Sequence, residues 1–253
     1  MSEIGYNCSW NIHNYMQVQS LELTEIVKKY KANDQSIVWG YANAKHNHLF
    51  LPEEYFIGLC ILEYMKNYYN PDKKILVDKE HKTIKISVSH DADISLDELR
   101  NNVTEIINDI LLKKFYIDNW KIIVNPAGTF IKYGPAADTG VTGRKLAVDN
   151  YGQDIPIGGG AFSGKDQSKL DKSAAFYARH LAKNYLLSSS IISEVYVKLS
   201  FMIGEEYGTA EYFNDNKKLI KTDKVSVEEI MKFNEKFRCK NTKYTFAPMS
   251  KIE

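Results

Sequence analysis

Three consecutive glycines at positions 158–160 open the stretch GGGAFSGKDQSKLDKSA, which most limits what this 253-residue chain can fold into. Because glycine has no Cβ, several backbone N–H groups can converge on one anion, and a helix expected to start near Ser168 adds its positive end. Lys165 and Lys169 supply compact positive charge for phosphate oxygens. Asp171 is the natural ligand for Mg²⁺, which usually takes one or two carboxylates plus substrate phosphates. The stretch therefore predicts a polyphosphate and metal site.

A second interpretation of the same residues stays open. Ser168 with Asp171 three positions later resembles a capping box, which would make the aspartate a helix-start residue without a metal. Glycine-rich stretches are also common turns. The stretch lacks the GxxxxGK[ST] spacing, so the mechanism of P-loop NTPases does not transfer to it.

Charge and cysteine usage exclude several classes of protein. The 33 basic and 32 acidic residues give a net charge of +1, which does not favour a broad nucleic-acid or membrane surface. No apolar run approaches the roughly 20 residues of a spanning helix, and the first residues lack the apolar core of a signal peptide. The cysteines, Cys8, Cys60 and Cys239, have no CxxC spacing and indicate reduced thiols. We expect a soluble, cytoplasmic protein.

Hydrophobic periodicity predicts alternating strands and amphipathic helices, which favours the α+β class. Ser95 and Glu98 form a capping box before an apolar stripe, and so mark the start of a helix. The expected strands are 82–89, 120–124 and 195–201, and the expected helices are 95–110, 173–187 and 226–237.

Four motifs occur in one order along the chain: NPAGTF from Asn125, GPAADTGVTGRK from Gly134, GGGAFSGKD from Gly158 and KLDKSAA from Lys169. Together they resemble the signature of methionine adenosyltransferases, also called S-adenosylmethionine synthetases. A weaker similarity covers QSLEL at 19–23, ANDQSIVWGYA at 32–42 and PDKK at 71–74.

The resemblance implies layered α/β sandwich domains with the first domain incomplete. Residues 1–31 would be a remnant of the N-terminal repeat with a shortened active-site loop, 32–131 the central domain, and 132–253 the C-terminal domain with the phosphate and metal loop. The family's Gly-His-Pro-Asp-Lys segment, which acts on the triphosphate and a Mg²⁺ ion, has no counterpart in this sequence.

The implied reaction is attack of the methionine sulfur on C5′ of ATP, which expels the whole triphosphate. A thioether carries no proton, so this step needs no general base. Alignment of sulfur with carbon and positive charge on the leaving group would lower its barrier. Mg²⁺ and K⁺ are the cofactors that the resemblance implies.

The resemblance also assigns roles to individual positions. Asp171 matches a Mg²⁺ ligand, and Phe130 matches the aromatic side chain that stacks on adenine. The triphosphate would be held by Lys74, Arg144, Lys145, Lys165 and Lys169, the rest of ATP by Asp34, Asp72, Gly160 and Ala161, and methionine by Gln19 and Asp138.

We therefore expect a subunit of a hetero-oligomeric methionine adenosyltransferase that uses ATP and L-methionine, with a partner chain supplying the missing catalytic segment. No nucleic-acid or membrane partner is expected. The alternative is a noncatalytic regulatory paralogue that binds nucleotide or S-adenosylmethionine. A self-sufficient enzyme using S-adenosylmethionine in another reaction is a third interpretation.

Overall fold

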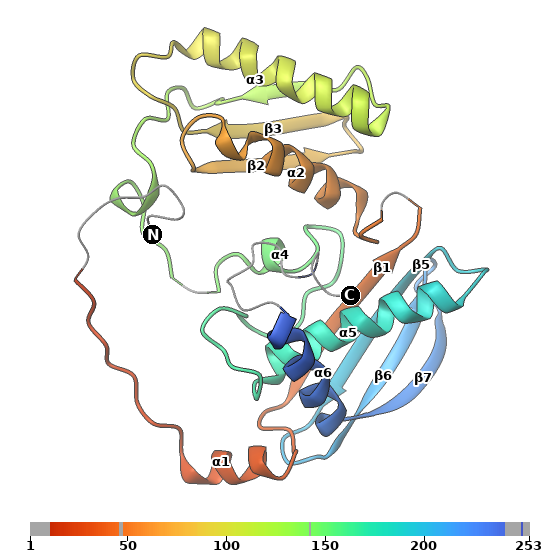
Figure 1. The fold of residues 1–253 in the computed structure, drawn as a ribbon. Helices are drawn as coiled ribbons and strands as arrows, with labels where there is room; N and C mark the ends of the chain where they lie inside the picture. The colour runs from red at the N-terminus through yellow and green to blue at the C-terminus, as the bar shows by residue number, and fades with distance from the viewer. Residues whose placement is uncertain (1–10, 46–47, 142, 241–248, 250–253) are drawn as a thin grey trace. The chain divides into compact units, whose positions relative to one another are not determined.

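A computed structural model describes residues 11–45, 48–141, 143–240 and 249 (Figure 1). The chain divides into two compact units. The first consists of residues up to Asn14 together with Glu53–Gly140, and the second of Tyr15–Pro52 together with Val141–Glu253. The second unit is thus built from two separate segments of the chain.

The first unit is a three-stranded sheet covered by two helices. Its strands lie in the order β2 (Lys73–Asp78), β3 (Thr83–Val88) and β4 (Lys121–Val124). β2 and β3 are antiparallel, whereas β3 and β4 are parallel and joined by a crossover that contains α3 (Leu96–Ile110). The core is formed by apolar side chains of the sheet, of α3 and of α2 (Glu53–Tyr64), among them Ile57, Ile61, Val77, Ile84, Ile86, Val88, Leu99, Val103 and Ile107.

Local sequence signals explain the start of α3. The Ser95 hydroxyl accepts a hydrogen bond from the Glu98 N–H at 3.2 Å, which confirms the predicted cap. The apolar stripe of the helix faces the sheet, as its periodicity indicates. A π-helical turn, Leu111–Phe115, follows and ends at Tyr116 in the left-handed conformation.

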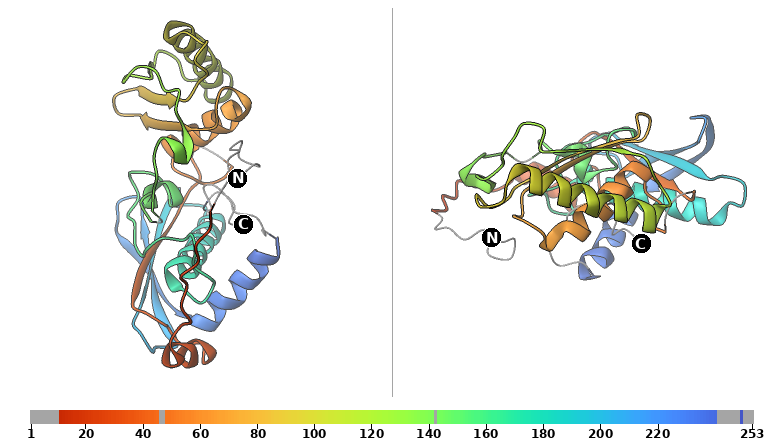
Figure 2. Two further views of the ribbon diagram at one scale, coloured as in Figure 1. Left: turned by 90° about the vertical axis from the view of Figure 1, so that its left-hand side faces the viewer. Right: turned by 90° about the horizontal axis from the view of Figure 1, so that it is seen from above.

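The second unit is an antiparallel sheet in the order β1 (Ser36–Asn43), β5 (Glu194–Phe201), β6 (Tyr207–Asn214) and β7 (Leu219–Ser226). The long helix α5 (Leu170–Ser188) crosses β1 and β5, and α6 (Val227–Lys240) packs against α5 (Figures 1 and 2). Two shorter helices, α1 (Leu21–Lys28) and α4 (Leu146–Asp149), complete this unit.

Helix α5 approaches β1 very closely because Gly40 has no side chain. A Cβ built on Gly40 would lie 2.1 Å from the carbonyl carbon and oxygen of Ala178. Arg179, which follows Ala178 in α5, is fully buried. Its guanidinium donates hydrogen bonds to the backbone oxygens of Tyr41, Leu49, Phe50 and Met249. Burial lowers the pKa of Arg179 to about 10, so the guanidinium stays charged at neutral pH.

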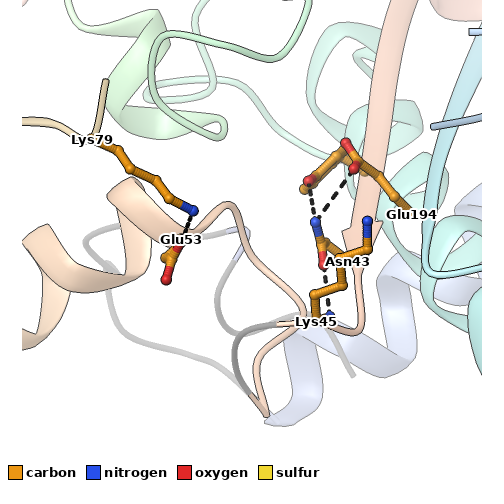
Figure 3. A network of polar contacts seen from close by, with 6 residues as sticks. Asn43, Lys45, Glu53, Lys79 and Glu194 are labelled. Atoms are coloured by element: carbon orange, nitrogen blue, oxygen red, sulfur yellow. Dashed lines mark hydrogen bonds and ion pairs between the residues drawn. The ribbon is translucent and has the colours of Figure 1, made fainter. Parts of the chain in front are cut away.

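Side chains extend the pairing of β1 with β5 at the end of β1 (Figure 3). The Asn43 amide donates to the Glu194 carboxylate at 3.5 Å and to the Tyr41 hydroxyl at 3.0 Å. Its oxygen accepts the Lys45 N–H at 2.7 Å. In the first unit, the same figure shows Lys79 of the β2–β3 turn paired with Glu53 at the start of α2.

The architecture confirms the predicted α+β class, and the domain limits at 31/32 and 131/132 stay predictions. Residues 32–52, expected with a central domain, belong to the second unit because β1 pairs along its whole length with β5. Residues 15–31 belong there too, while residues 1–10 lie outside the described part of the chain. In that described part, no helix has the length and apolarity needed to cross a bilayer.

Candidate functional site

The glycine loop lies directly against β1 and the first turn of α5. A Cβ on Gly158 would be 2.0 Å from the Ile37 carbonyl oxygen. Gly159 has φ +72°, and its Cβ would be 3.0 Å from Asp171 Oδ1. On Gly160 the Cβ would be 3.0 Å from Lys165 Nζ. The absence of side chains thus brings the loop backbone up to a cation and a carboxylate.

Lys165 and Asp171 form an ion pair beside this loop. The Ser36 hydroxyl at the start of β1 donates to Asp171 Oδ1 at 3.2 Å. Burial alone would raise the pKa of Asp171, but the hydrogen bond and charge of Lys165, with the Ser36 hydroxyl and the Gly160 N–H, outweigh it and lower the pKa. The two side chains are 27% and 29% exposed, so a ligand can still reach them.

The capping-box interpretation of Asp171 is wrong. Helix α5 begins at Leu170 with Lys169 as its N-cap residue, and no side-chain capping bond forms. The Ser168 N–H instead donates to the Asp166 carboxylate at 2.7 Å. Asp171 does lie in the first turn of α5, as that interpretation implied, but its carboxylate contacts Lys165 and Ser36 and forms no capping bond.

Two further predicted segments meet this cluster. The Lys169 ammonium donates to the Gln19 side-chain oxygen, 150 residues earlier in the chain. Gly143 has φ +88°, and a Cβ there would be 3.2 Å from the Cβ of Ala161. The turn that carries Arg144 therefore lies against the glycine loop.

Other predicted residues of the second unit are exposed. Arg144 and Lys145 lie in the turn before α4, where Lys145 Nζ donates to the Arg144 carbonyl oxygen at 3.3 Å. Asp34 lies just before β1, and its carboxylate accepts the Gln35 N–H at 2.8 Å.

The remaining predicted residues, Asp72, Lys74, Phe130 and Asp138, belong to the first unit. Asp72 Oδ2 accepts the Gly134 N–H at 3.3 Å, and so ties the PDKK segment to the segment that carries Asp138. Asp138 is exposed, and its N–H donates to the Gly134 carbonyl oxygen at 3.0 Å. Lys74 is exposed on β2, and Phe130 is half-buried.

Asn125 opens the NPAGTF motif and was not among the predicted site residues. Asn125 is 2% exposed and has φ +44°. Its side-chain oxygen accepts the Val88 N–H at 2.7 Å, and its amide donates to the Val88 carbonyl oxygen at 3.0 Å. β4 ends at Val124, and beyond it the Asn125 side chain makes the two hydrogen bonds to Val88 that the backbone of a neighbouring strand would make. Asn125 thereby fixes the start of the segment that leads to Phe130.

The structure also identifies Ser36, Ser89 and His90, none of which was predicted. Ser36 lies inside the quoted ANDQSIVWGYA motif, so its position was available but its contact with Asp171 was not. Ser89 and His90 directly follow β3 and are 0% and 1% exposed. Two consecutive buried polar residues after an alternating strand are the signal that could have revealed them.

The donor set near the glycine loop limits how it could hold a metal. Among the described residues, no group of three or more His, Cys, Asp or Glu side chains is arranged to bind an ion. Asp171 therefore fits Mg²⁺ only as a single carboxylate whose other ligands come from phosphate oxygens and water, which is a usual arrangement for this ion.

Comparison with known proteins agrees with the sequence motifs. The family described as S-adenosylmethionine synthetase, C-terminal domain, matches residues 133–247. The S-adenosylmethionine synthase of Petrotoga mobilis is 35% identical over 85% of this chain and 58% of its own length. S-adenosylmethionine synthase 1 of Pinus contorta is 32% identical, and the match covers 84% of this chain and 65% of the Pinus protein. A solved structure, of an unusual S-adenosylmethionine synthetase from Campylobacter jejuni, superposes with a TM-score of 0.66 at 25% identity and covers 86% of this chain and 65% of that one. The chain thus spans about three fifths of the relatives that it matches.

Proposed function

The chain belongs to the S-adenosylmethionine synthetase family, and we propose that it is one subunit of a hetero-oligomeric methionine adenosyltransferase. The complex would make S-adenosylmethionine from ATP and L-methionine. In this proposal, a second polypeptide of the same family supplies the Gly-His-Pro-Asp-Lys segment that the family uses on the triphosphate and a Mg²⁺ ion.

The cluster at the start of α5 is the observation that carries this proposal. Lys165 Nζ lies 3.0 Å from the place of a Cβ on Gly160, and Lys169 follows at the helix N-cap. Backbone N–H groups of a glycine loop, the helix N-terminus and two ammonium groups are complementary to a polyphosphate. The arrangement suits a reaction whose leaving group is triphosphate, because charge that develops there is met by donors already in place.

The other residues divide the substrates between them. We assign Arg144, Lys145 and Lys74 to the triphosphate, Phe130 to the adenine ring, Asp34 and Asp72 to the rest of the nucleotide, and Gln19 and Asp138 to methionine. Asp171 would hold Mg²⁺ together with phosphate oxygens, and the ion would supply positive charge to the leaving group. K⁺ and the cytoplasmic location stay predictions.

The test is a turnover assay of the complex that copurifies with this chain from its own cells. S-adenosylmethionine formation is measured with ATP, methionine, Mg²⁺ and K⁺, for the chain alone and for the complex. The chain alone should be nearly inactive, and Lys165→Ala in the complex should lower turnover by about 10²- to 10³-fold, the usual cost of losing one preorganised donor.

Lys218→Ala is the matched control, because Lys218 is an exposed lysine in the β6–β7 turn of the same unit. It should leave turnover unchanged. A complex with no turnover would refute the proposal. If Lys165→Ala retained full turnover while the chain still bound nucleotide, the chain would be the noncatalytic regulatory paralogue instead.

A further inference from the structure

The imidazole of His90 is held by backbone groups on both of its nitrogens. Nδ1 lies 2.9 Å from the backbone oxygen of Asp91, and Nε2 lies 3.3 Å from the backbone nitrogen of Phe130. The His90 N–H also donates to the Phe130 carbonyl oxygen at 3.0 Å. One buried residue therefore contacts both the N–H and the C=O of Phe130.

These partners determine the protonation state of the ring. A backbone carbonyl oxygen can only accept, and a backbone N–H can only donate. Nδ1 must therefore carry the proton and Nε2 must be the bare acceptor, which is the neutral Nδ1–H tautomer. The neighbouring Asp91 carboxylate accepts from the Asn70 amide at 3.1 Å, so the contact to His90 comes from the Asp91 backbone.

Ser89, the residue before His90, makes the corresponding contacts to Asp72. Its hydroxyl accepts the Asp72 N–H at 3.1 Å, and its N–H donates to the Asp72 carbonyl oxygen at 3.0 Å. Two consecutive buried residues after β3 thus hold the Asp72 segment with one side chain and the Phe130 segment with the other.

We propose that His90, as the neutral Nδ1–H tautomer, is the positioning residue of Phe130 for the nucleotide. It touches no substrate. It fixes the backbone of Phe130 through a reciprocal pair of hydrogen bonds, so that the bond carrying the half-buried ring has a set position and direction before the nucleotide arrives. The inference rests on the proposed role of Phe130 in adenine binding and adds to it the device that orients the ring.

Substitution of His90 by the amide residues Gln and Asn tests the contacts of Nε2 and Nδ1 one at a time. His90→Gln keeps an acceptor at the distance of Nε2, so the Phe130 N–H retains a partner. His90→Asn keeps a donor near Nδ1 but is too short to reach Phe130. The first variant should bind ATP within about twofold of the wild type, whereas the second should raise KM for ATP roughly 3- to 10-fold in the complex, the equivalent of one lost hydrogen bond. KM for methionine and kcat should stay unchanged in both.

Nuclear magnetic resonance of the ¹⁵N-labelled 253-residue chain gives a readout that does not depend on turnover. Long-range ¹H–¹⁵N spectra should show a protonated Nδ1 and an unprotonated Nε2 at His90. Amide exchange at Phe130 should be slow in the wild type and in His90→Gln, and faster in His90→Asn. If His90→Asn does not fold, the wild-type ring and amide still decide the question.

The outcomes distinguish the inference from the proposed function. A protonated Nε2, or rapid exchange at Phe130 in the wild type, would overturn the positioning role while leaving the enzyme proposal intact. Equal KM values for ATP in the Asn and Gln variants would do the same. A wild-type complex without turnover would refute the proposed function, and the resonance data would still decide whether His90 holds Phe130.

Discussion

Gly158→Ala tests the contact between the glycine loop and β1. The added Cβ would lie 2.0 Å from the Ile37 carbonyl oxygen and 2.8 Å from its carbon, both of which are backbone atoms of β1. Ordinary van der Waals contact begins near 3.4 Å, so loop and strand must separate by more than 1 Å. Overpacking costs about 1–3 kcal/mol and occasionally more. We expect the upper end, about 3 kcal/mol, because no flexible side chain can move aside.

For a unit of this size, that loss corresponds to a fall in the midpoint of thermal unfolding of roughly 6–12 °C. Calorimetry of the purified chain measures it. Gly160→Ala is the control, because its Cβ would meet only the ends of the Lys165 and Asp171 side chains, at 3.0 and 3.3 Å. The midpoint of thermal unfolding of Gly160→Ala should be close to that of the wild type, although the variant should bind nucleotide less tightly. Equal melting of Gly158→Ala and the wild type would show that the loop does not pack on β1 as described.

Three further substitutions test buried polar groups by chemical denaturation. Arg179→Met should destabilise the second unit by about 3–5 kcal/mol, because it leaves buried carbonyl oxygens without donors; a loss under 1 kcal/mol would contradict this. Asn125→Ala should cost about 1–3 kcal/mol, since both backbone groups of Val88 lose their partner, and unchanged stability would show that water replaces the amide. The lowered pKa of Asp171 contributes stability that is present above its unfolded value of about 4 and is lost as pH falls through the folded value. Asp171→Asn should flatten this acid-side loss, and an unaltered pH profile would refute the assignment.

Local elements could be predicted from the sequence, whereas their assembly could not. The start of α3 depends on Ser95 and Glu98, three residues apart, and on an apolar stripe within the same helix. The place of β1 in the four-stranded sheet depends instead on its pairing with β5. The side-chain contact between Asn43 and Glu194 joins residues that are 151 positions apart. No periodicity in either strand encodes that pairing, so the sequence alone could not show that the two strands share a sheet.

The candidate site shows the same division. The glycine loop, Lys165 and Asp171 lie within one continuous stretch whose residue types already indicate phosphate chemistry. Ser36 and His90 act through hydrogen bonds to residues that are 135 and 40 positions away. The Ser89–His90 pair after an alternating strand could draw attention to that position, but neither it nor Ser36 at the start of β1 carries a local sign of its partner, so these contacts could be recognised only in three dimensions.

The second unit is built from two separate segments of the chain, so its strands cannot all pair at the same time during synthesis on the ribosome. β1 leaves the exit tunnel early, but its hydrogen-bonding partner β5 is synthesised about 150 residues later, roughly 8–30 s at ordinary rates of translation. During that interval the nascent chain can close residues 53–140 into their own core. Translation speed between the codons for Asn43 and Glu194 would therefore set how long an unpaired β1 stays exposed to chaperones and to wrong partners.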